Sequence, residues 1–183
     1  EKKLQQAMTI LALILIATTA SSIVTNTSYV NIGSASQFGL GVAEESFPTA
    51  ALGILTREDF PEKILNISHD GGYIAATTGL KVFCDSRTAF YGPAFYKNLT
   101  GALLGQRTPW MGILSQWNPT AVVINGAWPD AGALANRLTT LRTQNGDPAW
   151  KLVYFDGATI IVIRNLPEYL TLINDPAIQK YGM

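Results

Sequence analysis

Hydrophobic and polar residues are distributed very unevenly along this chain. The segment Met8–Val24, MTILALILIATTASSIV, is apolar or small throughout, and it lies within a longer window, Leu4–Ala43, that contains no Asp, Glu, Lys or Arg. A helix over Met8–Val24 rises about 26 Å at roughly 1.5 Å per residue, close to the roughly 30 Å hydrocarbon core of a bilayer. The pattern therefore predicts a single transmembrane helix whose span ends at Met8 and Val24.

Two other interpretations of this segment stay open. The basic residues Lys2 and Lys3, the apolar core and the small residues Ala17–Ser22 are also typical of a cleavable signal peptide. A buried helix of a soluble core has a similar composition, although such helices are usually shorter. We interpret the segment as a retained membrane span.

The basic residues nearest to the span predict its orientation. Lys2 and Lys3 flank the N-terminal side, whereas the first Lys or Arg on the other side is Arg57. Because basic residues are enriched on the cytoplasmic side of membrane helices, we expect the N-terminus in the cytoplasm. The domain that follows the span is then expected outside.

The chain after the span divides into a polar arm and one folded domain. Thr25–Ser36 is uncharged and rich in Ser and Asn, which is typical of a linker or an extended surface arm. We expect a transmembrane anchor over residues 1–30, a linker arm over 31–46 and an extracytoplasmic α/β domain over 47–183. The last region has the ordinary size of one domain.

From Lys63 onwards, short apolar runs alternate with segments of helical spacing. The predicted strands are Ile64–Ile67, Lys81–Cys84, Ala121–Ile124, Trp150–Phe155 and Thr159–Ile163, with a two-residue turn at Asp156-Gly157 between the last two. The predicted helices are a segment from Ser46 to about Arg57, then Tyr73–Thr78, Pro93–Leu104, Pro109–Trp117, Pro129–Gln144 and part of Glu168–Tyr181. Ser68–Gly72 is expected to be a turn, and Leu134, Leu138 and Leu141 to be the buried face of their helix.

This order of elements predicts an α/β fold. Helical crossovers require parallel pairing among the first three strands, and the terminal hairpin adds an antiparallel edge. The expected fold is a single N-terminal transmembrane helix followed by a small α/β sandwich. Its sheet is mixed, with a parallel centre and a C-terminal antiparallel hairpin.

Composition excludes several classes of function. The 13 basic and 13 acidic residues give a net charge of zero, so the chain has no basic field for nucleic acid. One cysteine, Cys84, and one histidine, His69, exclude an intramolecular disulfide and a metal site rich in His or Cys. We expect no metal, no cofactor and no nucleic-acid partner.

Five polar residues that follow predicted strands form a candidate ligand cleft: His69, Asp70, Asp85, Arg87 and Asn125. Open α/β sheets bind ligands beyond the carboxyl ends of their parallel strands. His69 with Asp70 or Asp85 is a candidate acid–base pair. The alternative is structural, because Asp85 and Arg87 also suit an ion pair and a lone histidine is commonly a polar turn residue. We assign no catalytic residue.

Aromatic residues at loop and helix-start positions are candidate partner contacts. Tyr29 suits the outer headgroup level of a membrane, whereas Tyr91, Tyr96 and Trp128 can face another protein. Most of the remaining aromatic residues are expected in the core. Cys84, within an apolar strand, is expected to act as a small buried hydrophobe.

Several short motifs occur in one order between Phe38 and Tyr91. They are Phe38-Gly-Leu-Gly-Val42, Phe47-Pro48, Asp70-Gly-Gly-Tyr73-Ile, Lys81-Val-Phe-Cys-Asp-Ser-Arg87 and Tyr91-Gly92. Together they resemble the extracytoplasmic C-terminal domain of bacterial polytopic membrane proteins related to polyprenyl-phosphate-sugar glycosyltransferases. The resemblance covers about Phe38 to Asn165. It implies the fold and the outside location of the domain.

The resemblance does not imply an activity for this sequence. In such transferases the catalytic carboxylates and the lipid–sugar site lie on early transmembrane helices and the loops between them. We therefore expect a non-catalytic, single-span accessory subunit of the bacterial inner membrane. Its periplasmic domain would dock on and stabilise a larger respiratory, photosynthetic or transport complex. The alternatives are the C-terminal domain of a membrane glycosyltransferase and a stand-alone binding module for a sugar or a lipid.

Overall fold

The structure, a computed structural model, describes residues 1–33, 38–40, 47–126 and 131–179. The chain forms two compact units, Glu1–Ser46 and Phe47–Met183. Each unit is described by itself below. The expected contact residue Trp128 lies outside the described residues.

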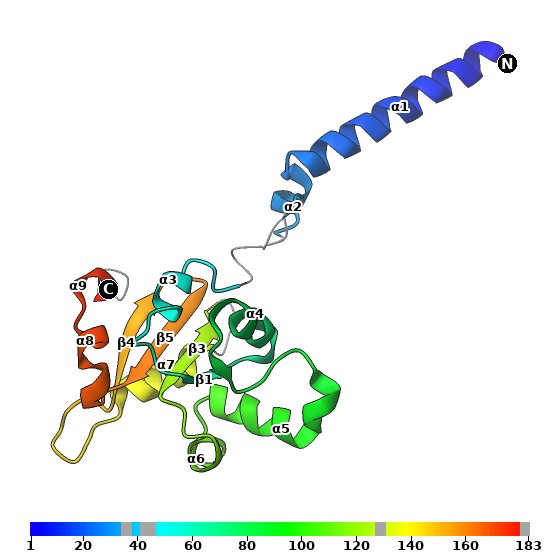
Figure 1. Ribbon diagram of the computed structural model, residues 1–183. Helices are drawn as coiled ribbons and strands as arrows, with labels where there is room; N and C mark the ends of the chain where they lie inside the picture. The colour runs from blue at the N-terminus through cyan, green and yellow to red at the C-terminus, as the bar shows by residue number, and fades with distance from the viewer. Residues whose placement is uncertain (34–37, 41–46, 127–130, 180–183) are drawn as a thin grey trace. The chain divides into compact units, whose positions relative to one another are not determined.

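The first unit is dominated by helix α1, Lys2–Val24, drawn in blue in Figure 1. The predicted apolar N-terminal helix is confirmed, and it starts six residues before Met8 because Lys, Leu, Gln and Ala are good helix formers. Its 23 residues rise about 35 Å. Among the described residues, α1 is the one helix that is long and apolar enough to cross a membrane, and no part of it is buried.

The expected extended arm contains a short helix instead. Helix α2 spans Thr27–Asn31, after Asn26 in the left-handed conformation at φ +61°. The Ser22 and Ser28 hydroxyls lie 2.6 Å apart and link α2 to the end of α1. The Asn26 side-chain oxygen also accepts a hydrogen bond from the Phe38 backbone nitrogen at 2.6 Å. These local hydrogen bonds allow a polar segment to turn back on itself, which composition does not reveal.

The second unit is built on a five-stranded mixed sheet, as predicted. Its strands are β1 Lys63–Asn66, β2 Lys81–Val82, β3 Ala121–Asn125, β4 Trp150–Phe155 and β5 Thr159–Arg164. Their order is β2-β1-β3-β5-β4. β1 pairs in parallel with β2 and β3, whereas β5 pairs antiparallel with β3 and β4. The parallel centre and the antiparallel C-terminal hairpin are both confirmed.

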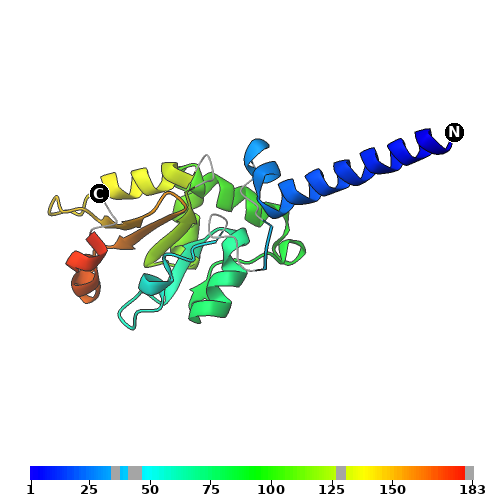
Figure 2. The same cartoon turned by 90° about the horizontal axis from the view of Figure 1, so that it is seen from above.

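Helices cover both faces of this sheet (Figures 1 and 2). They are α3 Leu52–Leu55, α4 Ser68–Thr78, α5 Thr88–Leu103, α6 Arg107–Gln116, α7 Ala131–Thr140, the 3-10 helix η1 Pro167–Tyr169, α8 Leu170–Ile173 and α9 Pro176–Gln179. Alternate residues of one strand face opposite sides, so Leu65 joins a core with α5, α6 and α7, while Ile64 joins a core with α3, α4, α8 and α9. β3 is buried along its whole length because its alternate residues contribute side chains to both cores.

Several predicted helices differ from those observed, first among them α3 and α5. Of the helix expected from Ser46 to about Arg57, Ser46 lies outside the described residues and the observed helix is only the four-residue α3, because residues 47–51 form bends and turns before it and the Arg57 side chain is held by Asp59 and Asp175 after it. α5 begins at Thr88 rather than Pro93. It is two helical segments joined at Gly92, whose φ of +76° and ψ of +169° are not helical.

Predicted boundaries also shift around α7 and the hairpin. Leu134 and Leu138 are fully buried, but α7 ends at Thr140 and Leu141 is 37% exposed, which corrects its expected place on the buried face. The turn between β4 and β5 has three residues rather than two. There the Asp156 carboxylate accepts hydrogen bonds from the Ala158 and Thr159 backbone nitrogens.

Candidate functional site

Asn66 organises the carboxyl end of the parallel strands. Its Nδ2 donates to the carbonyl oxygens of Ile67 and Cys84, both at 2.7 Å. Its Oδ1 accepts from the backbone nitrogen of Phe83 at 2.8 Å and, more weakly, from that of Cys84 at 3.4 Å. The Asn66 side chain thus makes the hydrogen bonds to Phe83 and Cys84 that backbone groups of β1 would make if β2 were longer. The predicted buried strand Lys81–Cys84 is in fact the two-residue edge strand β2.

Helix α4 packs directly against this junction. A Cβ built on Gly71 would lie 1.8 Å from the Cys84 carbonyl oxygen and 2.7 Å from Asn66 Nδ2. Only glycine permits this approach, so the expected turn Ser68–Gly72 forms the first turns of α4 instead. Tertiary packing overrides the low helix propensity of the two adjacent glycines.

Asp70 is a buried carboxyl group in the first turn of α4. The residue is 1% exposed, and its Oδ1 has no hydrogen-bond partner among the described residues. Removal from water raises the pKa of Asp70 from the ordinary 3.8 to about 7. Nearby, burial and the charges of Asp85 and Asp70 raise the pKa of the Cys84 thiol to about 12. Cys84 therefore stays a neutral thiol rather than a nucleophile.

Asp85 and Arg87 form the structural ion pair that the sequence allowed as an alternative. Arg87 Nε lies 3.0 Å from both carboxylate oxygens, Arg87 Nη2 lies 2.6 Å from Oδ2, and the Arg87 backbone nitrogen donates to Oδ1. The side-chain hydrogen bond from Arg87 is the main cause that lowers the pKa of Asp85 to about 2. A carboxylate that is already neutralised by its own neighbour has little charge to offer a ligand.

His69 does not pair with either aspartate. Its ring stacks on Phe47 with centroids 5.0 Å apart and an interplanar angle of 14°. Phe47 also contacts Tyr73, at 5.0 Å. The contact fixes the start of the folded unit against α4, and the candidate acid–base pair does not form among the described residues.

The fifth residue of the candidate cleft, Asn125, is 6% exposed at the end of β3. The five predicted residues therefore divide by role. Asp70 and Asn125 are buried, Asp85 and Arg87 neutralise each other, and His69 packs on an aromatic ring. They lie near the carboxyl ends of the strands, where most of their side-chain contacts are with other parts of the fold.

Two of the candidate partner residues, Tyr91 and Tyr96, belong to an aromatic cluster on α5. Tyr91 stacks on Phe95 at 4.7 Å, and Tyr96 meets both rings edge-on. Tyr29, Tyr91 and Tyr96 are each half-buried, and the Tyr96 hydroxyl is buried without a hydrogen-bond partner among the described residues. The neighbouring Phe90 is 82% exposed and is the most exposed large apolar side chain described in the second unit.

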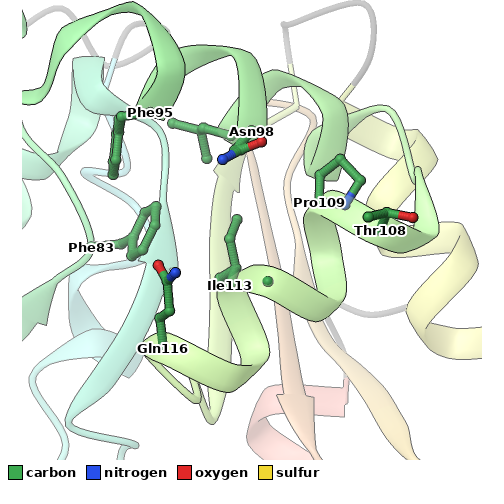
Figure 3. Close-up of a pocket in the computed structure, with 9 residues that line it drawn as sticks. Phe83, Phe95, Asn98, Thr108, Pro109, Ile113 and Gln116 are labelled. Carbon is green, nitrogen blue, oxygen red and sulfur yellow. The ribbon is translucent and has the colours of Figure 1, made fainter.

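A pocket of about 320 Å³ lies between α5, α6 and the segment after β2 (Figure 3). The residues that line it are Phe83, Phe95, Asn98, Leu99, Thr108, Pro109, Gly112, Ile113 and Gln116. None of the five predicted cleft residues is among them. Sequence reasoning missed this pocket because its polar residues lie on helices rather than after strands, and helical polar residues are ordinarily surface residues.

The described residues contain no group of three or more His, Cys, Asp and Glu side chains that could hold a metal ion. The polar groups at the carboxyl edge of the sheet serve the fold, and those of the pocket are neutral. Comparison of the chain with models of protein families, with curated proteins and with solved structures finds no match.

Proposed function

We propose that this protein is a non-catalytic accessory subunit that is anchored in a membrane by α1 and docks on a larger integral membrane complex through its α/β unit. The bilayer is that of a bacterial inner membrane, with the N-terminus in the cytoplasm and the α/β unit in the periplasm. The position of Lys2 and Lys3 in the first turn of α1 supports this orientation.

The observation that carries the proposal is the surface of α1. Its large apolar side chains from Leu4 to Ile16 are 54% to 66% exposed. A continuous apolar surface of this length is unfavourable in water and suits a bilayer. The hydroxyls of Thr9, Thr18 and Thr25 bond back to carbonyl oxygens four residues earlier, which lowers their cost in lipid.

A charge in the middle of α1 tests the anchor. Leu13→Arg places a guanidinium at the centre of the helix, and we expect the free energy of insertion to become about 3 kcal/mol less favourable. Leu4→Arg is the matched control, because an arginine near the helix end reaches the interface. Carbonate extraction of membranes measures the inserted fraction of the full chain. Equal insertion of Leu13→Arg and Leu4→Arg would contradict a transmembrane role for α1.

Phe90 supports the docking part of the proposal. The break at Gly92 separates the first turn of α5, which carries Phe90, from the rest of the helix. Arg87 lies over the Phe90 ring at 6.0 Å, and Tyr91 meets that ring edge-on at 5.6 Å. Exposed aromatic and arginine side chains are the types most enriched where proteins bind one another.

Docking is tested by purification of the tagged full chain from its native membranes in a mild detergent. We expect partner proteins to co-purify in fixed proportion, and Phe90→Ala to lower their yield several-fold with no change in thermal unfolding. Phe155→Ala is the matched control, since Phe155 is a half-exposed phenylalanine on the edge strand β4. A chain that elutes alone from native membranes would overturn the accessory role.

A further inference from the structure

The helices on the two faces of the sheet differ in charge. Helices α5, α6 and α7 contain three basic residues, Lys97, Arg107 and Arg137, and no Asp or Glu. The helices on the other face, α3, α4, η1, α8 and α9, contain two acidic residues, the buried Asp70 and Glu168, and no Lys or Arg. A chain of zero net charge thus separates its helical charges between two layers, which lie on opposite faces of the sheet (Figure 2).

The basic residues of the α5–α7 layer, formed by α5, α6 and α7, are not neutralised within the fold. The chain has no Asp or Glu between residues 86 and 129. Within the described ranges, none of Lys97, Arg107 and Arg137 forms an ion pair, whereas Arg87, just before α5, does. The charge of these three side chains is therefore available to an anion outside the protein.

The three basic side chains belong to one continuous helical surface. A Cβ built on Gly105 would lie 3.7 Å from Arg137 Cδ, so α7 lies beside the end of α5. Arg107 is the first residue of α6, and Lys97 lies about two helical turns before the end of α5. Helices α5 and α6 pack on each other along the pocket that they share.

Two exposed apolar side chains accompany these basic residues. Leu104, directly after α5, is 42% exposed, and Met111 in α6 is 52% exposed. Leu104 follows Lys97 by seven residues and Met111 follows Arg107 by four, so each pair lies on one face of its helix. Helical surfaces that combine basic and apolar side chains are typical of proteins that lie on a bilayer, because the former bind phosphates and the latter enter the acyl boundary.

We propose that the α5–α7 layer lies on an anionic phospholipid bilayer. Lys97, Arg107 and Arg137 bind headgroup phosphates, and Leu104 and Met111 enter the boundary between headgroups and acyl chains. Each basic side chain near such a surface strengthens binding about fivefold. The inference rests on the anchor proposed for α1, which holds the chain at a bilayer and so favours lipid over an acidic protein as the source of the negative charge.

A fluorescent label on the α5–α7 layer tests the contact. The full chain with Met111→Cys is labelled with the environment-sensitive fluorophore NBD, and Cys84 does not react because it is fully buried. Leu170→Cys is the matched control, since Leu170 is 43% exposed in α8 on the opposite face of the sheet. Each chain is mixed with vesicles of phosphatidylcholine alone, or with about 30% phosphatidylglycerol, which makes the surface negative.

We expect the NBD emission of Met111→Cys to rise about twofold in the anionic vesicles relative to the neutral ones, because the label leaves water. The emission of Leu170→Cys should be the same in both. An increase in salt from about 0.1 M to about 1 M shortens the Debye length from about 10 Å to about 3 Å and should remove most of the rise.

A charge variant tests the three cations in the Met111→Cys background. Lys97→Gln, Arg107→Gln and Arg137→Gln together should abolish the rise in emission. The matched control removes the same charge from the strands β1, β2 and β4 and should keep the rise; it combines Lys63→Gln, Lys81→Gln and Lys151→Gln.

Each of four results would contradict the lipid contact. The label at Met111 could respond equally in both vesicles, the label at Leu170 could respond as strongly as that at Met111, or the Lys97, Arg107 and Arg137 variant could keep the full rise. A salt-sensitive rise in native membranes but in neither vesicle would assign the layer to an acidic protein. Carbonate extraction of the same vesicles measures anchoring by α1 separately, so retention without a label response contradicts the lipid contact alone, and a label response without retention contradicts the anchor alone.

Discussion

Among the glycines that the structure describes, Gly71 is the one at which a change to alanine is expected to cause the largest loss of stability. The new Cβ would lie 1.8 Å from the Cys84 carbonyl oxygen, and that oxygen belongs to the backbone and is bonded to Asn66. Relief of the clash requires α4 to move away from the end of β2 and so breaks the Asn66 hydrogen bonds. We expect a loss of about 3–5 kcal/mol in the free energy of unfolding, or failure to fold.

The neighbouring glycine is a close control for this prediction. Gly72 lies in the same helix, is exposed, and a Cβ there meets no atom within 4 Å. Gly72→Ala should therefore stabilise the unit by up to about 1 kcal/mol through helix propensity alone. Urea unfolding of the full chain, followed by tryptophan fluorescence, measures both, because all four tryptophans lie after Phe47. Equal stability of the two variants would mean that α4 does not approach Cys84 closely.

Asp70→Asn is expected to remove a large pH dependence of stability. In the folded protein the pKa of Asp70 is raised from 3.8 to about 7 by burial, so the folded state holds a proton that the unfolded state releases. The stability of the wild type therefore decreases as the pH rises from about 4 to about 7, and it is level with respect to this group above that range. Three pKa units correspond to about 4 kcal/mol.

The pH profile of the difference between the two proteins isolates this group, since every other titrating residue is common to both. Unfolding of the full chain at a series of pH values between 4 and 8 gives that difference. We expect the stability of Asp70→Asn relative to the wild type to increase between about pH 4 and pH 7 and then to stay level, with Asp70→Asn the more stable protein at pH 8. A difference that stays constant with pH would show that the carboxyl group is not desolvated.

These two predictions concern residues that the sequence marked for function. Asp70 was a candidate cleft residue, and Gly71 lies beside it in the motif that carries the family resemblance. In the structure, both lie against the junction that Asn66 makes with Phe83 and Cys84. A motif of polar and glycine residues after a strand can therefore mark a close contact between a helix and a neighbouring strand end as well as a ligand site.

The elements that the sequence predicted best are those whose hydrophobic pattern directly indicates which residues are apolar or buried. The apolar helix α1, the buried strand β3 and the hairpin of β4 and β5 lie where their hydrophobic patterns placed them. The parallel and antiparallel pairings also follow from the order of elements, because a helical crossover and a tight turn each permit one strand direction.

Contacts between distant segments were decided by the tertiary structure alone. Asn66 and Cys84 are 18 residues apart, and the pocket joins residues of α5 and α6 through the packing of Gly101 on Pro109. Local periodicity records which face of an element is buried, but it does not record which atom lies opposite. The sequence alone therefore determined the long apolar helix and the directions in which the strands pair. Packing decided the buried Asp70, the close approach at Gly71 and the uncharged pocket.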